Sequence, residues 1–306
     1  MDFRQLEVFI AVVELSSFSK AGEQLYLSQP TVSAHISALE KELAVPLLIR
    51  NTREVYTSEA GQQLYDYACR LIRLRDEAIE AVSNKAEQEK GIISIAASTI
   101  PTKYILPSLI SAFCRNHPSI SFNIIPCDSS TVYTAIEKGE VKIGFGGTAV
   151  NMDLYRHYPI ATDKLVIITP NNEHFQSIAQ LSNPLNELLK EPFICRASGS
   201  GTRHEFERYL AEHHFNSKLN VVAEMHDTEG IKNSVVQGLG IAAISERAAE
   251  DMVRFKLLKE FTLPNGGERF LYLIRQKKDR LNERERLFCN FVLEHAPLSK
   301  TSKYAI

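Results

Sequence analysis

"LSQPTVSAHISALEKEL", residues 27–43, has the spacing of an amphipathic helix with one unusually small side. Four apolar residues at offsets of four, three and four share one side of such a helix: Val32, Ile36, Leu39 and Leu43. The other side carries small or hydrogen-bonding residues and no acid before Glu40: Thr31, Ser33, Ala34, His35, Ser37 and Ala38. Ser28 is placed to cap the helix, and Pro30 falls in its first turn, where a missing N–H matters least.

The residues before this stretch predict two more helices. Asp2 and Gln5 have the spacing of a capping pair, and an apolar stripe follows: Leu6, Phe9, Ile10 and Val13. A second, short helix ends near Tyr26, with Ser19 placed to cap it and two residues placed to face inward, Ala21 and Leu25. Two short helices joined by a tight connection, after a supporting helix, form a helix-turn-helix unit.

The small side of the helix suits the DNA major groove. In a helix-turn-helix the second helix enters that groove, and its N-terminal residues meet base edges. A groove about 12 Å wide accepts a helix whose outer face is slim and free of repelling carboxylates. We therefore predict that the first turns bind DNA: Ser28, Gln29, Pro30, Thr31, Ser33, Ala34 and His35. The alternative is an ordinary amphipathic helix with a solvated polar face.

The next segment, VPLLIRNTREVYTSEAG (residues 45–61), predicts a wing of two short extended segments around RNTRE. Arg50 and Arg53 lie at its tip, where we expect them to reach flanking phosphates or a minor groove. The alternative for both is a solvated surface arginine.

With these residues in view, the sequence resembles the LysR-type transcriptional regulators. The residues that match fall at the family's spacings: Ala21, Leu25, Ser28-Gln29-Pro30, Val32-Ser33, Ile36, Leu39-Glu40, Leu43, Val45-Pro46-Leu47, Arg50, Thr57 and Ala60-Gly61. Two positions depart, since Ala34 stands where an arginine and its phosphate contact are common, and Leu48 replaces a usual aromatic. The resemblance implies a mixed fold: a mainly α winged helix-turn-helix, a coiled-coil linker helix, and a two-lobed α/β effector domain resembling type 2 periplasmic binding proteins.

A long helix with a coiled-coil seam follows the wing. Its apolar residues repeat at offsets of three and four: Leu64, Tyr67, Leu71, Leu74, Ala78 and Ala81. This pattern predicts a dimer, and the alternative is a single helix that packs on its own domain. From Ser83 the polar run SNKAEQEKG indicates a hinge.

The net charge of residues 1–58 opposes a DNA-binding function. Five cations (Arg4, Lys20, Lys41, Arg50, Arg53) face seven anions (Asp2, Glu7, Glu14, Glu23, Glu40, Glu42, Glu54), and 5 − 7 gives −2. Affinity that is independent of DNA sequence comes from cations that neutralise phosphates. We therefore expect weak non-specific binding and a strong dependence on oligomeric state, because linked modules gain effective concentration.

From Ile92 short apolar segments alternate with amphipathic ones, which is typical of an α/β fold with mostly parallel sheets. We expect strands at 92–98, 121–126, 142–147, 164–170, 192–197, 220–225, 240–246 and 268–275, and helices at 104–118, 130–139, 201–214, 228–238 and 282–296. By resemblance, the domains are 1–58 (winged helix-turn-helix), 59–90 (linker helix and hinge) and 91–306 (effector domain). Lobe I is then 91–160 and 269–306, and lobe II is 161–268.

Polar clusters follow several of these strands, where ligands of open α/β sheets bind. By resemblance, eight hydroxyl residues are expected to line a cleft between the lobes: Ser98, Thr99, Thr102, Ser129, Thr148, Ser198, Ser200 and Thr202. They suit a small anion or polar metabolite, and the similarity of ASTIPTKYILP to sulfur-linked family members adds sulfur metabolites. The alternative is that each residue merely caps a helix.

No motif supports catalysis or a cofactor. Residues 144–149 and 238–243 fit a loose G-x-G-x-x-A pattern, but neither has a strand before it and a helix after it. SGSGTR lacks the ending of a phosphate loop, and no G-x-S-x-G elbow is present. None of the nine histidines has metal-ligand spacing. We therefore expect no enzyme, no cofactor and no metal.

The composition fits a soluble chain of two or more folding units, with 306 residues, 44% hydrophobic and 24% charged. No apolar run approaches the roughly 18–20 residues of a membrane span. The N-terminal MDFRQLEVF has no basic region before an apolar core, so we expect no secretory signal and a cytoplasmic location. Five scattered cysteines favour a reducing compartment.

We therefore predict a sequence-specific DNA-binding transcription regulator whose DNA contacts change when a small polar or anionic metabolite binds between two lobes. Its expected partners are promoter or operator duplex DNA, the metabolite, and further copies of the chain, as a dimer through residues 59–90 and a tetramer built from it. The alternative is a solute-binding protein of the transport type, without catalytic activity, which would have no use for residues 1–90.

Overall fold

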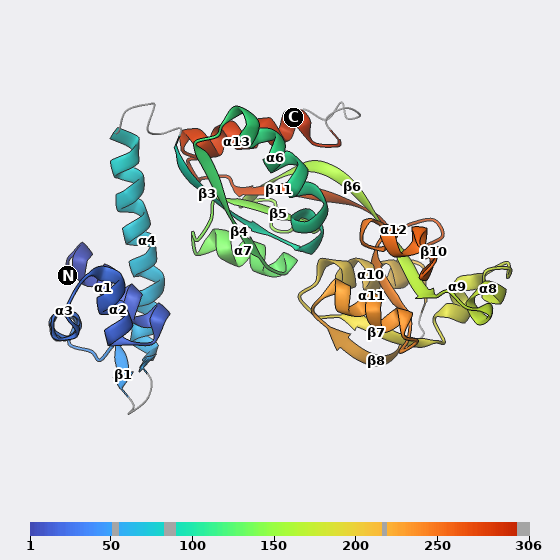
Figure 1. Ribbon diagram of the computed structural model, residues 1–306, viewed down its shortest axis with the longest axis horizontal. Coiled ribbons are helices and arrows are strands. Elements are labelled where there is room, and N and C mark those ends of the chain that lie inside the picture. The colour runs from blue at the N-terminus through green and yellow to red at the C-terminus, as the bar shows by residue number, and fades with distance from the viewer. Residues whose placement is uncertain (51–54, 83–89, 216–218, 299–306) are drawn as a thin grey trace. The chain divides into compact units, whose positions relative to one another are not determined.

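The structure is a computed structural model that describes residues 1–50, 55–82, 90–215 and 219–298. The chain divides into two compact units (Figure 1). The small unit is formed mainly by residues 1–88, and the large unit by residues 89–137 and 141–306.

Three short helices open the small unit: α1 (Phe3–Leu15), α2 (Phe18–Leu25) and α3 (Gln29–Leu43). The capping pair predicted for α1 is confirmed, because Asp2 accepts the N–H of Gln5 and the Gln5 side chain accepts the N–H of Asp2. The cap predicted for α3 is also confirmed, with Ser28 accepting the N–H of Thr31.

The predicted cap of α2 was wrong. Ser17, not Ser19, has extended backbone and accepts the N–H of Lys20, so the helix begins at Phe18, two residues earlier than a cap at Ser19 allows. The turn from α2 to α3 is tight, since a Cβ added at Gly22 would lie 2.7 Å from the carbonyl oxygen of Leu27. Only a residue without a side chain fits there.

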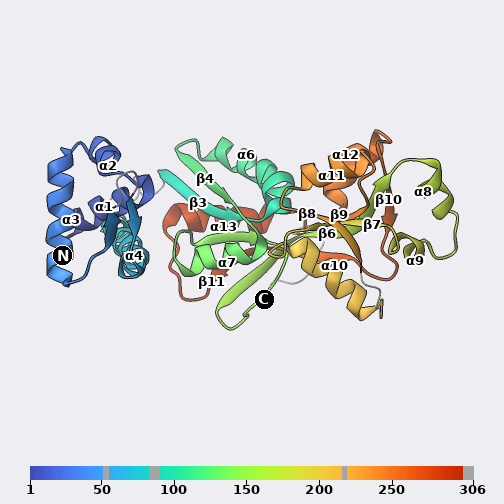
Figure 2. The ribbon, with the colours of Figure 1, turned by 90° about the horizontal axis from the view of Figure 1, so that it is seen from below.

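The core of the small unit follows the predicted apolar pattern. Val32, Ile36 and Leu39 of α3 are fully buried, whereas Leu43 in the last turn is 36% exposed. Figure 2 shows α1 between α3 and α4 (Glu59–Val82), and α1 contacts α2, α3 and α4. Helix α1 is therefore the supporting element of the unit.

A two-stranded wing follows α3, as predicted. Strands β1 (Leu48–Arg50) and β2 (Val55–Thr57) pair antiparallel, with Ile49 opposite Tyr56. Residues 51–54, which include Arg53, and the side chain of Arg50 lie outside the described residues. The roles expected for both arginines therefore stay predictions.

The long helix α4 has two apolar faces. One face packs on the small unit through buried Ala68 and partly buried Leu64, Tyr65 and Ile72. The other presents most of the predicted seam, with Tyr67 63%, Leu71 37% and Leu74 62% exposed. Leu64 therefore follows the alternative, a helix that packs on its own domain, whereas the next seam residues face outward and the dimer stays a prediction. The side chain of Ala81 is outside the described part of the chain.

The large unit alternates strands and helices. In chain order they are β3 (Gly91–Ala97), the π-helical η1 (Pro101–Ile105), α6 (Leu106–Asn116), β4 (Ile120–Pro126), α7 (Ser129–Glu137), β5 (Ile143–Gly146), β6 (Tyr155–Pro170), α8 (Glu173–Ile178), α9 (Pro184–Leu188), β7 (Pro192–Arg196), α10 (Gly201–Glu212), β8 (Asn220–Met225), α11 (Thr228–Val236), β9 (Ala242–Ser245), α12 (Glu246–Arg254), β10 (Leu258–Thr262), β11 (Glu268–Gln276) and α13 (Glu283–His295).

The expectation of mostly parallel sheets was wrong. Strand β3 pairs parallel with β4 and β5, and β7 with β8, but β6 pairs antiparallel with β9, β10 and β11, and β11 antiparallel with β5. The reason is that β6 and β11 are long strands that run in opposite directions between the two halves of the unit (Figure 1).

Helices cover both faces of the β3–β5 part of the sheet. Ile93 and Ile95 of β3 point to the core under α6 and α13, which includes Phe113 and Phe288. The alternate residue Ala96 packs on the opposite face against α7. Each face is therefore buried, which explains the nearly continuous apolar run of this strand. The second half has its own core around Phe193 and Phe206.

Candidate functional site

The N-terminal half of α3 presents the small face that the sequence predicts. Gln29, Pro30 and Ala34 are exposed, and Ser33 and His35 are partly exposed. The hydroxyls of Ser28 and Thr31 lie 2.8 Å apart and bond to each other, and the Ser28 hydroxyl also caps the helix. These two groups are thus held in place, whereas the remaining positions are open to a partner.

Several acids of the small unit are engaged by partners within the unit. The carboxylate of Glu40 accepts the backbone N–H groups of Leu47 and Leu48, at 2.8 and 3.1 Å, and so anchors the start of the wing. Glu7 pairs with Arg75 at 2.7 Å, and this bond holds its pKa below the ordinary value. The carboxylate that ends the acid-free run is therefore structural.

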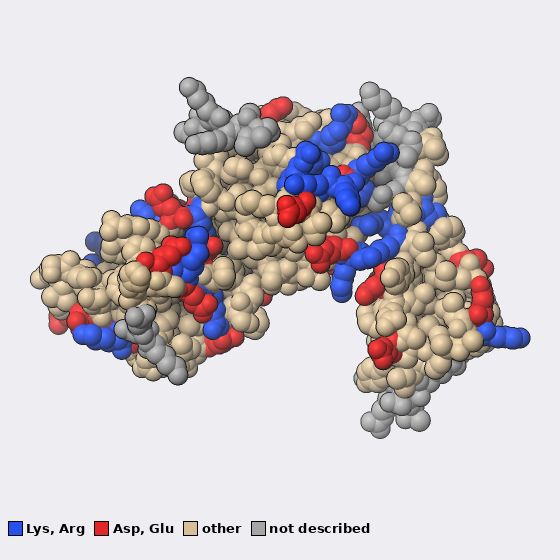
Figure 3. Space-filling model, turned by 180° about the vertical axis from the view of Figure 1, so that it is seen from behind, with Lys and Arg blue, Asp and Glu red and all other residues tan. Residues whose placement is uncertain are grey.

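Two more of the seven acids have internal partners: the hydroxyl of Tyr65 donates to Glu14 at 3.1 Å, and Glu42 pairs with the N-terminal amine. On the face seen in Figure 3, the charged side chains of the small unit are few and scattered, and they form no large patch of one sign. Four of the seven acids in residues 1–58, Glu7, Glu14, Glu40 and Glu42, are thus engaged by internal partners.

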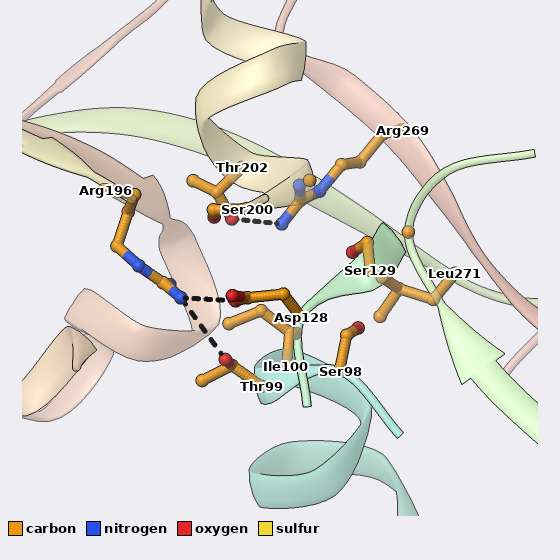
Figure 4. A pocket seen from close by; sticks show the side chains of 12 residues that line it. Ser98, Thr99, Ile100, Asp128, Ser129, Arg196, Ser200, Thr202, Arg269 and Leu271 are labelled. Carbon is orange, nitrogen blue, oxygen red and sulfur yellow. Dashed lines mark hydrogen bonds and ion pairs between the residues drawn. The ribbon is translucent and has the colours of Figure 1, made fainter. Parts of the chain in front are cut away.

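In the large unit, a small polar cavity lies where several strands end (Figure 4). Its lining comes from both halves of the unit: Ser98, Thr99, Ile100, Asp128, Ser129, Gly147, Arg196, Ser200, Gly201, Thr202, Arg269 and Leu271. Its inner volume is about 20 Å³, room for the centres of one or two water-sized groups. Two arginines dominate its chemistry.

Arg196 ends β7 and reaches across the cavity (Figure 4). Its side chain is 4% exposed, donates to the hydroxyls of Thr228 at 2.9 Å and Thr99 at 3.5 Å, and lies 3.7 Å from the carboxylate of Asp128. Its Nε atom is buried and has no hydrogen-bond partner. Burial lowers the pKa of this guanidinium, which signals the cost of holding its charge here.

Arg269 of β11 is held more firmly. Its Nε and Nη2 donate to one oxygen of Asp163, at 2.9 and 2.7 Å, and its Nη2 donates to the hydroxyl of Thr202 at 3.2 Å. The other oxygen of Asp163 accepts the hydroxyl of Ser245 at 2.6 Å. Since Asp163 lies on β6, this network joins the two long strands to the cavity wall.

The N-terminus of α10 also opens on the cavity. Ser200 is its N-cap residue, yet its side chain makes no capping bond. A Cβ added at Gly201 would lie 2.6 Å from the hydroxyl of Ser129 and 3.0 Å from that of Thr148, so a larger residue there would displace both hydroxyls. Free N–H groups at a helix start attract anions.

Five of the eight predicted hydroxyl residues line the cavity: Ser98, Thr99, Ser129, Ser200 and Thr202. Thr148 lies beside Gly201, and its hydroxyl is buried without a partner. Thr102 lies elsewhere and donates to the carbonyl of Ala97 at 3.1 Å, and Ser198 is exposed outside the lining. Neither Thr102 nor Ser200 makes the side-chain capping bond of the alternative, because the Thr102 hydroxyl donates to a carbonyl and the Ser200 side chain caps nothing.

The sequence analysis missed the charged residues of the cavity: Asp128, Arg196 and Arg269. Arg196 could have been found from the sequence, because a charged residue directly after the apolar run PFIC indicates a functional position at the end of a strand. Arg269 could not, since its partner Asp163 is 106 residues away.

Two family models match the chain. Residues 3–62 match the bacterial regulatory helix-turn-helix protein of the LysR family, and residues 86–297 match the LysR substrate binding domain. The chain belongs to the LysR family, and it is a DNA-binding transcription regulator with an effector-binding domain.

Relatives support this along the whole chain. An uncharacterised HTH-type transcriptional regulator of Methanocaldococcus jannaschii is 32% identical over 94% of this chain and 96% of its own length. The HTH-type transcriptional activator CmpR of Synechocystis is 30% identical over 95% and 94%. The crystal structure of CbnR, a LysR family regulator, has a TM-score of 0.72 at 19% identity, covering 97% of this chain and 99% of CbnR. It shows that the fold is shared.

Among the described residues, no helix is both long enough and apolar enough to cross a bilayer. In the same part of the chain, no three His, Cys, Asp or Glu side chains are arranged to hold a metal ion.

Proposed function

We propose that α3 is the helix that reads DNA, through Ser28, Gln29, Pro30, Thr31, Ser33, Ala34 and His35. The observation that carries this proposal is the exposed, carboxylate-free N-terminal half of α3, with Glu40 turned to the wing. Ser28 and Thr31 then position the first turn, and Gln29, Ser33 and His35 offer hydrogen bonds to bases. Arg50 and Arg53 of the wing contact flanking phosphates. CbnR has been solved with its target DNA.

The chain works as a dimer through α4, and a tetramer is built from dimers. Support comes from the exposed row Tyr67, Leu71 and Leu74, which a lone chain leaves in water. Two DNA modules then meet half-sites spaced by whole turns of the duplex. We divide the chain into 1–58 (DNA reading), 59–90 (dimerisation and hinge) and 91–306 (effector binding). Lobe I is 91–160 and 269–306, and lobe II is 161–268.

The effector is a small polar or anionic metabolite, with sulfur metabolites among the candidates, and it binds in the cavity of the large unit. Ser98, Thr99, Ser129, Ser200 and Thr202 support this assignment because they line it. Binding shifts the lobes, changes the spacing of the DNA modules and alters operator contacts or bending. The proposal includes no catalytic activity and a cytoplasmic location, where DNA and metabolites meet.

A selection from random duplexes tests the DNA part. The full chain is incubated with a pool of random 40-base-pair duplexes (about four helical turns), and the bound duplexes are sequenced over several rounds. The expected result is an enriched inverted repeat whose half-sites are separated by whole helical turns. Enrichment of no sequence, at low salt and with the dimer confirmed by light scattering, contradicts the proposal.

A further inference from the structure

Two buried guanidinium groups and one partly exposed carboxylate line the cavity: Arg196, Arg269 and Asp128. Asp163, which is outside the lining, pairs with Arg269, so the charge balance inside the cavity depends on how well Arg196 and Asp128 are paired. The side chains of Arg196 and Arg269 are only 4% and 5% exposed. A buried guanidinium is costly unless its charge is well paired.

The two carboxylates serve different roles. Asp163 is fully buried and saturated by Arg269 and Ser245, with Arg247 at 4.0 Å, so it belongs to the framework. Asp128 is 29% exposed and touches Arg196 through a single contact of 3.7 Å, which is too long for a hydrogen bond. It is therefore a weak internal partner that a better anion can replace.

Hydrogen-bonding groups without partners also indicate that the cavity suits an anion. The Nε atom of Arg196 and the hydroxyl of Thr148 are buried without partners, and the hydroxyl of Ser200 makes no capping bond. Donors from Arg196, Ser200 and the start of α10 thus surround a space of about 20 Å³. Only Ile100 and Leu271 offer it apolar surface, so an apolar ligand body has no pocket here.

We infer that the effector enters as a compact oxyanion, or as the oxyanion group of a larger metabolite, held between Arg196 and Arg269 at the start of α10 with Asp128 as its internal competitor. This rests on the proposed effector site. Arginine forks match oxyanion geometry, and a helix N-terminus adds positive potential. Asp128 then sets specificity, because an anion binds in the cavity only if it interacts with Arg196 more strongly than the Asp128 carboxylate does.

Calorimetry on the full chain tests the inference at constant ionic strength in chloride. The probes are sulfate, inorganic phosphate, methyl phosphate and acetate, with dimethyl sulfone as an uncharged match for sulfate in size. At least one oxyanion should bind, and the sulfone should not. The affinities for inorganic phosphate and methyl phosphate are compared: tighter binding of inorganic phosphate indicates a free ion, and tighter binding of methyl phosphate indicates an oxyanion group on a larger molecule. Equal binding of the sulfone, or binding of no anion, overturns the inference.

Two variants assign the binding to these residues. Asp128→Asn should tighten oxyanion binding about tenfold, because the competing charge is gone. The matched Asp251→Asn, an exposed carboxylate on α12, should leave it unchanged. Arg196→Gln should weaken it at least tenfold, and Arg115→Gln, exposed on α6, should not. If Arg196→Gln does not fold, the sign of the Asp128→Asn effect decides, and no tightening overturns the inference.

The outcome also separates this inference from the proposed function. If an uncharged metabolite from a screen binds and Thr202→Val weakens it, the effector site stands and the oxyanion inference fails. If oxyanions bind as expected but never change DNA binding, the anion site stands and the regulatory proposal fails.

Discussion

Asp163 is the residue on which the cavity wall depends most. It is directly opposite Arg269 in the pairing of β6 with β11, and both side chains are buried. Breaking such a pair leaves an uncompensated buried charge. Asp163→Asn should therefore lower the free energy of unfolding of the large unit by about 3–5 kcal/mol, measured by urea denaturation. Asp251→Asn is the control. If both variants change the free energy of unfolding by an equally small amount, Asp163 does not stabilise the cavity wall.

Thr202 links Arg269 to the cavity. Its hydroxyl accepts from Arg269 at 3.2 Å, so Thr202→Val removes one contact that orients the guanidinium without changing side-chain volume. We expect affinity for the best oxyanion probe to fall about five- to tenfold by calorimetry, and operator affinity without the probe to be unchanged. Thr102→Val is the matched control, since that hydroxyl bonds only locally to Ala97. Unchanged probe affinity in Thr202→Val counts against the site.

His157 gives the large unit a pH dependence. Burial lowers the pKa of this histidine below 6.5, and its Nε2 lies 2.9 Å from the hydroxyl of Tyr133. The unfolded chain therefore takes up this proton more readily than the folded one, so stability is lost as the pH falls below about 6.5 and is unaffected above it. The unfolding temperature, measured between about pH 5 and 8, should fall less toward low pH in His157→Gln than in the parent protein. Identical slopes for both proteins refute the assignment.

At the scale of elements, local patterns were predictable and long-range partners were not. The apolar side of α3, its Ser28 cap and the wing follow from residues a few positions apart. Ser17 and Ser19 both lie near the start of α2, and spacing alone did not show which of them caps it. The short elements α8, α9, α12 and β10 were missed, and β6 extends nine residues before the predicted start at 164, because its first half is polar and covered only by tertiary contacts.

The site divides in the same way. Hydroxyl residues after strands were found because their position follows from the alternation of strands and helices. The arginines were not found. The role of a charged residue in a buried strand can be inferred only when its partner is known, and Asp163 and Arg269 are far apart in the sequence. The mixed sheet was missed for a related reason: the return of the chain through β11 reverses the strand direction.

Helix α4 carries the dimer prediction at this scale. Leu74 is 62% exposed on the outer row of the helix, so a carboxylate there leaves the small unit intact but places two like charges in the seam of a dimer. Leu74→Glu should reduce the dimer to monomer at micromolar concentration by light scattering, and should weaken operator binding at the same time. Gln63→Glu, an exposed position on the same helix, is the control. A variant that stays dimeric places the interface elsewhere.

For the whole molecule, three properties have to act together. Residues 1–58 carry a net charge of −2, so we expect one module alone to bind duplex weakly. In the proposed function, a second module in the dimer raises the effective concentration, and effector binding in the cavity changes the spacing of the two modules. The residues proposed to read bases, join chains and bind the metabolite do not overlap, so we expect each set to be alterable without the others.

The most direct test of this account is the affinity of Ser33→Glu for the selected operator duplex, measured by fluorescence anisotropy at physiological salt. Ser33 is partly exposed on α3, so the variant keeps its fold, and the account predicts a loss of about 100-fold or more because a carboxylate then faces the groove. Ser111→Glu, exposed on α6 and equal in net charge, should bind as the parent does. A folded Ser33→Glu dimer with parental operator affinity would contradict the claim that this side of α3 enters DNA.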